Sequence, residues 1–181
     1  TDVTRTISLN TKDKKIKKIF TRVLQGHLNL SNSRLTKNTT GSDLDKVARK
    51  KLKKMNLDYA HGTGHGVGYF LNVHEGPQSI SKLNKIKLKP GMILSNEPGY
   101  YEKGKYGRRI EKLIYIKKNK NEMKFENLTY APIDKNLIEK KLLNEKEILW
   151  LNNYHQLVFK KLKKYMNKNE LILLKNSCSN I

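Results

Sequence analysis

The sequence predicts an α+β fold, in which helices flank a glycine-rich β region. Residues 12–29, 42–55 and 145–166 repeat apolar side chains at helical spacing. Between them, residues 61–117 hold short apolar or alternating stretches that glycine and proline interrupt. Helical and β segments that occupy separate parts of a chain are typical of the α+β class. With 181 residues, the chain can form one domain with a hydrophobic core.

The N-terminal third contains one expected strand and two expected helices. Residues 2–9 alternate and are rich in β-branched side chains, which favours a strand. Residues 12–29 place their apolar side chains on one helix face. The second helix is expected to begin at Ser42, a suitable N-cap, and to end near Met55.

The rest of the chain contains the remaining expected strands and the last expected helix. The turn Pro90-Gly91 introduces a short apolar strand from Met92 to Leu94. Residues 108–117 alternate and are expected to form one strand. Residues 119–127 resemble a polar hairpin, and residues 128–130 a further short strand. Residues 145–166 form the last expected long helix.

The charge is strongly positive, with 38 basic and 16 acidic residues and a formal net charge of +22. Such a balance can indicate a nucleic-acid or anionic-surface binder. However, only six of the basic residues are Arg, the residue best suited to two-pronged phosphate contacts. The Lys residues are spread along the chain and not interleaved with aromatics. We therefore attribute the charge to compositional bias and do not expect nucleic acid to be the partner.

Hydrophobic run length and cysteine content bear on the expected location of the protein in the cell. No run of eighteen apolar residues is present, so we expect no membrane span. Cys178 is the single cysteine, which cannot form an internal disulfide and does not suggest a zinc cluster. A reducing compartment, the cytoplasm, is the simplest interpretation.

Four residues could together hold hard divalent cations: Asp2, His65, Glu97 and Glu111. Each alone has an ordinary interpretation, because acidic side chains on strands usually face water. Glu97, however, follows an apolar strand inside the turn sequence SNEPG, and Glu111 lies between apolar residues. Carboxylates on different strands repel one another in a low dielectric unless a cation lies between them. A dinuclear metal site would resolve that repulsion.

The segment 61–77 carries five glycines and three of the five histidines of the chain. Its glycines alternate with β-type residues, at positions 62, 64, 66 and 68. Because glycine has no side chain, we expect these positions to let a metal or a ligand approach the backbone closely.

Several long motifs resemble those of eukaryotic-type aminopeptidase P, a pita-bread (creatinase/methionine-aminopeptidase-like) metallopeptidase. The matching stretches are 1–6 (TDVTRT), 61–77 (HGTGHGVGYFLNVHEGP), 95–101 (SNEPGYY), 109–111 (RIE) and 151–155 (LNNYH). The resemblance extends to about residue 165. It implies that residues 1–165 are the C-terminal part of a catalytic domain and that residues 166–181 are a C-terminal tail.

The resemblance also implies roles. Asp2 and Glu111 are similar to the two bridging carboxylates of the metal centre, and His65 to the single imidazole ligand of one ion. Glu97 is similar to a ligand of that ion that also shuttles the proton of the attacking water. His61 and His74 resemble the two pocket histidines that contact the scissile carbonyl and the proline side of the substrate. The cofactors implied are two divalent ions, expected to be Mn²⁺.

The chain departs from the family pattern at a few positions. The first aspartate ligand of the family lies eleven positions before the second, ahead of Thr1, so the fold is expected to be incomplete at its N-terminal side. A further upstream pocket histidine is absent too. Arg108 replaces an expected Ile and Lys112 an expected Asn. By strand alternation, Lys112 should face away from Glu111 and do little harm.

The function implied is removal of the N-terminal residue from peptides with proline in second position. Because one aspartate ligand is missing, residues 1–181 alone are expected to be inactive or nearly so. The resemblance also suggests a homodimer. A prolidase or methionine aminopeptidase is a close rival, but the segment 61–77 favours aminopeptidase P. The alternative from another class is a non-catalytic peptide- or nucleic-acid-binding protein on the same fold.

Overall fold

The computed structural model describes residues 2–10, 12–70, 72–120 and 122–181. Its α-helices are α1 (Lys14–Ser31), α2 (Gly41–Lys53), α3 (Glu145–Leu162) and α4 (Lys168–Ser177). Single 3₁₀ turns are η1 (Lys135–Leu137), η2 (Lys140–Leu142) and η3 (Lys163–Tyr165). No helix in these ranges combines the length and the apolar character needed to cross a bilayer.

The strands form small antiparallel sheets. The largest has the order β3-β6-β7 and contains β3 (Ile93–Asn96), β6 (Lys112–Asn119) and β7 (Glu122–Asn127). β1 (Gly64–His65) pairs with β2 (Ser79–Ile80), and β4 (Gly99–Glu102) pairs with β5 (Tyr106–Arg109). A bridge between Gly66 and Leu94 connects β1 to β3. Helices and antiparallel strands therefore combine in one unit, which confirms the α+β prediction.

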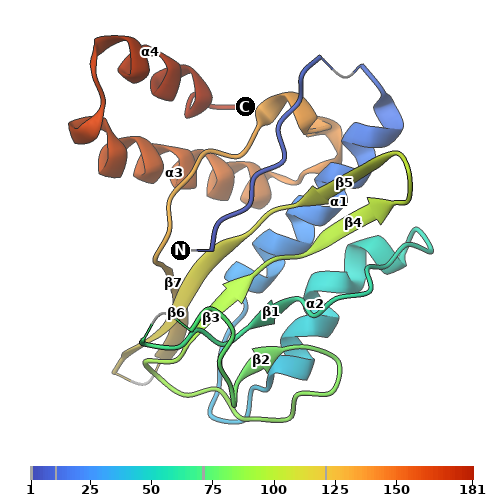
Figure 1. Cartoon of the computed structure of the whole chain (residues 1–181), viewed down its shortest axis with the longest axis vertical. Coiled ribbons are helices and arrows are strands. Elements are labelled where there is room, and N and C mark those ends of the chain that lie inside the picture. Colours follow the sequence, from blue (N-terminus) through green and yellow to red (C-terminus); the bar gives the residue numbers. More distant parts are fainter. Residues whose placement is uncertain (1, 11, 71, 121) are drawn as a thin grey trace.

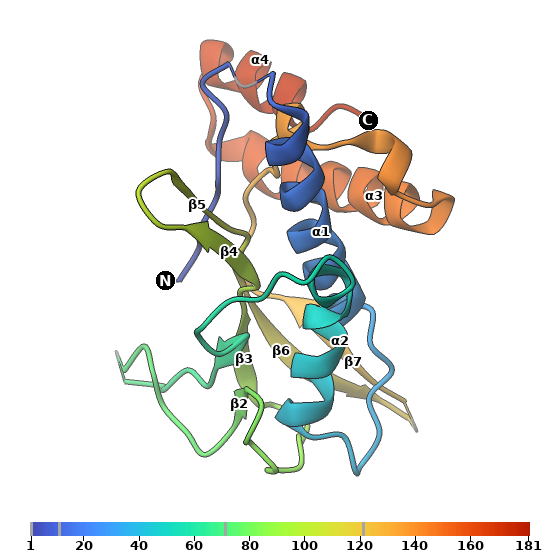
Figure 2. The same ribbon diagram turned by 90° about the vertical axis from the view of Figure 1, so that its right-hand side faces the viewer.

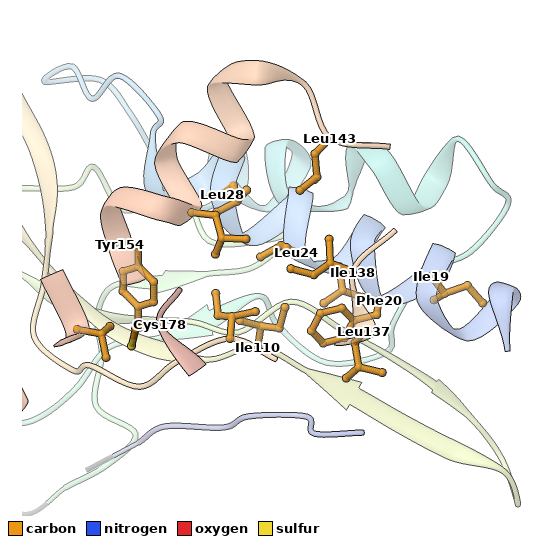
Figure 3. Packing of buried hydrophobic residues seen from close by; sticks show 14 of the residues in the cluster. Ile19, Phe20, Leu24, Leu28, Ile110, Leu137, Ile138, Leu143, Tyr154 and Cys178 are labelled. Carbon is orange, nitrogen blue, oxygen red and sulfur yellow. The ribbon is translucent and has the colours of Figure 1, made fainter. Parts of the chain in front are cut away.

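The helices α3 and α4 lie together at one end of the molecule, whereas α2 and β2 lie toward the other (Figures 1 and 2). One hydrophobic cluster joins α1 to α3 and to residues 133–143, as Figure 3 shows for Phe20, Leu24, Leu28 and Tyr154. A second cluster joins α2 to the β3-β6-β7 sheet. The apolar stripe of α1 thus contributes to the core, as its periodicity predicts.

Helix boundaries depend on capping side chains. Thr40, not Ser42, is the N-cap of α2, and it forms a capping box with Asp43. The spacing of Thr40 and Asp43 is typical of this motif. The prediction that Ser42 is the N-cap was therefore wrong. Asn144 with Glu147 and Asn167 with Glu170 form the same motif at α3 and α4.

Three strand predictions were wrong. Residues 2–8 are extended but form no strand, and one backbone bond, from Glu111 N to Thr4 O (3.1 Å), joins them to the β region. The expected strand 108–117 is two strands, β5 and β6, separated at Ile110 and Glu111. Residues 128–130 form no strand, because the pairing partner of β6 is β7, within the expected hairpin.

The last sixteen residues contain a packed helix. Leu174 and Cys178, from α4 and its C-cap, are buried in the same cluster as Tyr154 and Val158 of α3. Their burial removes apolar surface from water, at about 25 cal/mol per Å². This segment therefore contributes to the core.

Candidate metal centre

His65 lies between two carboxylates from distant parts of the chain. Its Nε2 atom is 3.2 Å from Oδ2 of Asp2 and 3.5 Å from Oε1 of Glu97. Its Nδ1 atom is 3.0 Å from the carbonyl oxygen of Gly66. A carbonyl can only accept a hydrogen bond, so the proton of the neutral ring is assigned to Nδ1.

This tautomer directs the Nε2 lone pair of His65 toward the carboxylates of Asp2 and Glu97. Three acceptor atoms at these separations repel one another unless a cation lies among them. An imidazole with carboxylates is a donor set suited to divalent ions such as Mn²⁺ or Zn²⁺. A backbone carbonyl that orients the other ring nitrogen is the usual outer support of a metal-bound histidine. The residues therefore fit a metal ion.

Glu97 and Glu111 are neighbours because of strand register. Asn96 at the end of β3 pairs with Lys112 at the start of β6. Because the two strands are antiparallel, the residue that follows Asn96 lies opposite the residue that precedes Lys112. Glu97 and Glu111 occupy these positions, where the ladder ends and the side chains can turn toward His65. Donor atoms of His65, Glu97 and Glu111 lie within 4.8 Å of one another.

Arg109 and Thr4 support the acidic pair. Arg109 places Nη1 3.6 Å from Glu97 Oε2 and Nε 3.6 Å from Glu111 Oε2. Thr4 donates its hydroxyl to Glu111 and accepts from Arg109 Nε at 3.2 Å. Burial raises the pKa of Glu111, with repulsion from Glu97 and Asp2 adding to the effect and the hydroxyl of Thr4 opposing it. Residues two positions apart in an extended chain point to the same face, so Arg109 reaches the same site as Glu111 although β5 ends between them.

His74 approaches the same centre from the glycine-rich segment. Its ring stands edge-on to that of His65, with centroids 4.2 Å apart. Asp2, His65 and His74 form a second group of donor atoms within 4.8 Å of one another. Sequence reasoning placed His74 in the pocket, but it did not group this residue with the metal donors.

His61 is paired with Tyr101, a residue to which the sequence analysis gave no role. Tyr101 Oη lies 2.9 Å from His61 Nε2, and His61 Nδ1 lies 2.6 Å from the carbonyl oxygen of Gly62. By the argument used for His65, Nδ1 carries the proton and Nε2 accepts from the hydroxyl of Tyr101. Burial raises the pKa of Tyr101. The position of Tyr101 within the SNEPGYY motif was the available signal.

A buried ionic network on α2 fixes the backbone before β1. Arg49 binds Asp45 at 2.8 Å and donates to the carbonyl oxygen of His61 at 2.7 Å. Asp45 also accepts from the hydroxyl of Thr63 at 2.6 Å. Hydrogen bonds to charged groups are stronger than neutral ones, so this network holds the segment 61–63 in place.

The alternating glycines accommodate the protein's own backbone. A side chain at Gly64 would collide with the carbonyl oxygen of Ser95 on β3, and one at Gly66 with that of Glu75. Close approach was the expected property of these positions, but the neighbours are adjacent segments of the chain. Gly64 therefore allows β1 to pack against β3, and Gly66 allows the segment at Glu75 to pack beside it.

Arg108 and Lys112, the two residues that depart from the family pattern, both face the interior. Lys112 is fully buried, with Nζ 4.6 Å from the centroid of the Trp150 ring and 5.2 Å from that of Tyr154. Arg108 is also buried and stacks on Tyr106, and its Nη atoms have no hydrogen-bond partner among the described residues. Burial lowers the pKa of Lys112 to about 7. The expectation that Lys112 does little harm overlooked the cost of burying its ammonium group.

Comparison with known proteins gives the family. The sequence model described as metallopeptidase family M24 matches residues 1–118, and that of the C-terminal region of peptidase M24 matches residues 121–181. The chain belongs to metallopeptidase family M24. Its α+β architecture is the pita-bread fold of these peptidases, as expected.

Relatives within the M24 family are similar over most of this chain. A protein named probable Xaa-Pro aminopeptidase P from Laccaria bicolor is 49% identical over 166 residues, which are 86% of this chain and 26% of that protein. The X-prolyl aminopeptidase of Caenorhabditis elegans, described as a cytosolic enzyme with a di-nuclear active site, matches with a TM-score of 0.93 and 41% identity. That match covers 100% of this chain and 31% of the solved one. The prolidase of Pyrococcus furiosus gives a TM-score of 0.64 and 32% identity over 71% of this chain and 36% of its own.

The chain of this M24 member spans about a quarter to a third of the length of these relatives. Within the described residues, the likeness to the worm X-prolyl aminopeptidase extends over α3 and α4, whereas the match to the prolidase covers less of the chain.

Proposed function

We propose that the protein containing this chain is a metal-dependent aminopeptidase that removes the N-terminal residue from peptides with proline in second position. The observation that carries the proposal is the lone pair of His65 Nε2, which faces the carboxylates of Asp2 and Glu97 at 3.2 and 3.5 Å. Such a set of acceptors is suited to a cation. The relatives named as Xaa-Pro aminopeptidases support the substrate class.

Asp2, His65, Glu97 and Glu111 would hold a centre of two divalent ions. When bound, the ions would polarise the substrate carbonyl and make water a stronger nucleophile. We propose Mn²⁺ as the physiological ion, a cytoplasmic location and a homodimer as parts of the same hypothesis. The cytosolic description of the worm enzyme supports the location.

Glu97 is the residue proposed to accept a proton from the attacking water and return it to the leaving amine. Its Oε1 accepts from Ser95 Oγ at 3.0 Å, and its Oε2 faces Arg109. These partners orient the carboxylate without occupying all of its lone pairs. Glu97 can therefore hold a proton at one oxygen while the other remains available to the metal centre.

His61 and His74 are proposed to contact the substrate on the two sides of the scissile bond. Neutral His61 cannot donate from Nε2, because its proton lies on Nδ1 and Nε2 already accepts from Tyr101. A protonated His61 could donate to the developing oxyanion if Tyr101 moved aside. The position of the Tyr101 hydroxyl would therefore determine whether Nε2 of His61 is free to contact the substrate.

The test uses the full-length product of the gene and, in parallel, residues 1–181 alone. Hydrolysis of Arg-Pro-Pro and of Arg-Ala-Ala is followed with Mn²⁺ and with a chelator. We expect the full-length protein to cleave the proline peptide alone, with activity that the chelator removes. Glu97→Gln should lower kcat by about a hundredfold or more, since it removes the proton acceptor.

The matched control is Glu122→Gln, which makes the same change at an exposed position on β7. It should leave kcat unchanged. Equal cleavage of both peptides would contradict the proline specificity. Full activity in the presence of the chelator would contradict the metal mechanism.

A further inference from the structure

A groove of about 920 Å³ lies at the end of the molecule opposite α4, at the far end of β6 (Figure 1). Residues 34–37, residues 87–90 and the ends of β6 and β7 line it. Pro90 and Met123, together with the side-chain stems of the lysines, provide its apolar surface, and Leu35 and Leu88 lie buried beneath them. A hollow of this size can receive several side chains of a peptide.

The groove is separate from the candidate metal centre. Glu111 immediately precedes β6, whereas Lys118, near the end of β6, lines the groove. Seven residues of strand at ~3.3 Å each separate the two positions by roughly 23 Å. The groove therefore serves neither to hold the metal nor to support its ligands.

The rim of the groove is cationic. Its six basic side chains are all exposed: Arg34, Lys37, Lys87, Lys89, Lys118 and Lys120. Among the described lining residues, Glu122 is the single acidic one. None of the six basic side chains forms an ion pair with a carboxylate of the described residues. The rim can therefore attract an anionic partner without first breaking ion pairs of its own.

Backbone contacts hold the walls of the groove in place. Leu35 forms a β-bridge with Met123, which fixes residues 34–37 against β7. Leu88 N donates to Thr39 O at 2.9 Å, and Gly91 N donates to Ile116 O at 2.8 Å. A preformed groove spares a ligand the free energy of ordering these segments.

The lining favours one class of occupant. Single-stranded nucleic acid usually binds where aromatic side chains stack with bases, and none of the described residues that line this groove is aromatic. A phosphate backbone would also gain nothing from the apolar surface at Pro90 and Met123. We propose that the groove binds a short acidic peptide segment of a partner protein, with its carboxylates at the lysine rim and a Leu- or Met-like side chain at the base.

The test measures fluorescence anisotropy with residues 1–181 and a labelled peptide of Asp and Glu residues around a central Leu-Leu pair. A second peptide carries Ser-Ser at the centre, and a third probe is a single-stranded DNA of equal charge. We expect the Leu-Leu peptide to bind about tenfold more tightly than the Ser-Ser peptide, since the apolar side chains add burial. Lys89→Glu with Lys118→Glu should weaken it by a further tenfold or so, because like charges then face the acidic peptide.

The matched control is Lys160→Glu with Lys163→Glu, which changes the net charge equally but lies on α3 and η3 at the other end of the molecule. It should leave the affinity within about twofold, apart from long-range screening effects. Equal weakening in the control pair, or no preference for Leu-Leu, would overturn the proposal. DNA that binds more tightly than the peptide and displaces it would assign the groove to nucleic acid instead.

Discussion

The Nε2 atom of His65 lies 3.2 Å from Oδ2 of Asp2, although 63 positions separate the two residues in the sequence. His65 reaches this position from β1, and Asp2 reaches it from an extended segment with no strand partners. Their pairing makes metal affinity depend on how firmly the N-terminal segment is held.

Removal of one donor should weaken metal binding. Asp2→Asn keeps the shape of the side chain but removes its charge, so affinity for Mn²⁺ should fall by about tenfold or more. Isothermal titration of residues 1–181 measures this change. Glu122→Gln, which also removes one negative charge but at an exposed position on β7, is the control. Wild-type residues 1–181 should bind no more than one ion per chain, and weakly, because the two groups of donor atoms among the described residues share His65. Two tightly bound ions would contradict this expectation.

Arg109 should act through its two carboxylate neighbours. Its Nη1 and Nε atoms lie 3.6 Å from Glu97 and Glu111, and Arg109→Lys replaces the planar fork with a single ammonium group. We expect metal affinity to fall by about tenfold while the fold is retained. Arg34→Lys, at an exposed position on the groove rim, is the control. Unchanged metal affinity in Arg109→Lys would show that the orientation of these carboxylates does not depend on the guanidinium.

Lys112 should reduce stability at neutral pH. Its pKa is about 7 in the folded chain, against an ordinary value of 10.5. Between these values the unfolded chain binds a proton that the folded chain has lost, so wild-type stability rises as pH increases across this window. Below about pH 7 the folded chain must bury a cation, which a neutral side chain avoids. Lys112→Met should therefore raise the free energy of unfolding by about 1–4 kcal/mol near neutral pH.

The gain from Lys112→Met should shrink as the pH approaches 10.5, because the wild-type penalty disappears there. Urea denaturation at several pH values measures both effects, with Lys118→Met as an exposed control. A gain that is the same at all pH values would assign the effect to packing and not to the charge of Lys112.

Arg5 should connect the N-terminal segment to α3. Its guanidinium donates to the carbonyl oxygens of Ala131 and Glu111 and, at 2.9 Å, to the hydroxyl of Tyr154. Arg5→Lys should cost about 1–3 kcal/mol of stability, because several acceptors lose a charged donor. It should also weaken metal binding, since Asp2 lies three residues away. Tyr154→Phe removes one of these bonds and should have the same effect at a smaller magnitude. A larger effect would show that the Tyr154 hydroxyl acts mainly through its hydrogen bonds to the backbone of Ala131.

Sequence reasoning succeeded where local chemistry decides the outcome. The periodicity of residues 12–29 predicted α1, and the apolar run before Glu97 predicted β3 close to its observed position. Asp2, His65, Glu97 and Glu111 were grouped because hard-metal chemistry needs such donors, and the fold places them together. Their metal-binding role is a proposal that the titrations above test.

Prediction from the sequence failed where contacts between residues far apart in the chain decide the structure. Alternation in residues 108–117 carries no sign of the break at Ile110 and Glu111, which depends on the end of the β3–β6 ladder. The burial of Lys112 depends on the rings of α3, more than thirty positions later. Residues 2–8 have β propensity but no adjacent strand among the described residues, so they stay extended without forming a ladder.

The attachment of residues 2–8 through side chains has a consequence for dynamics. A segment held by Arg5, Thr4 and Thr6, with one backbone bond to Glu111, can open without disturbing the core. In native-state hydrogen exchange, its amides should exchange at a low opening free energy, while those of α1 exchange only on global unfolding. Because Asp2 travels with this segment, every such opening removes one carboxylate from His65. The lifetime of a bound ion would then be limited by a local fluctuation at the edge of the structure.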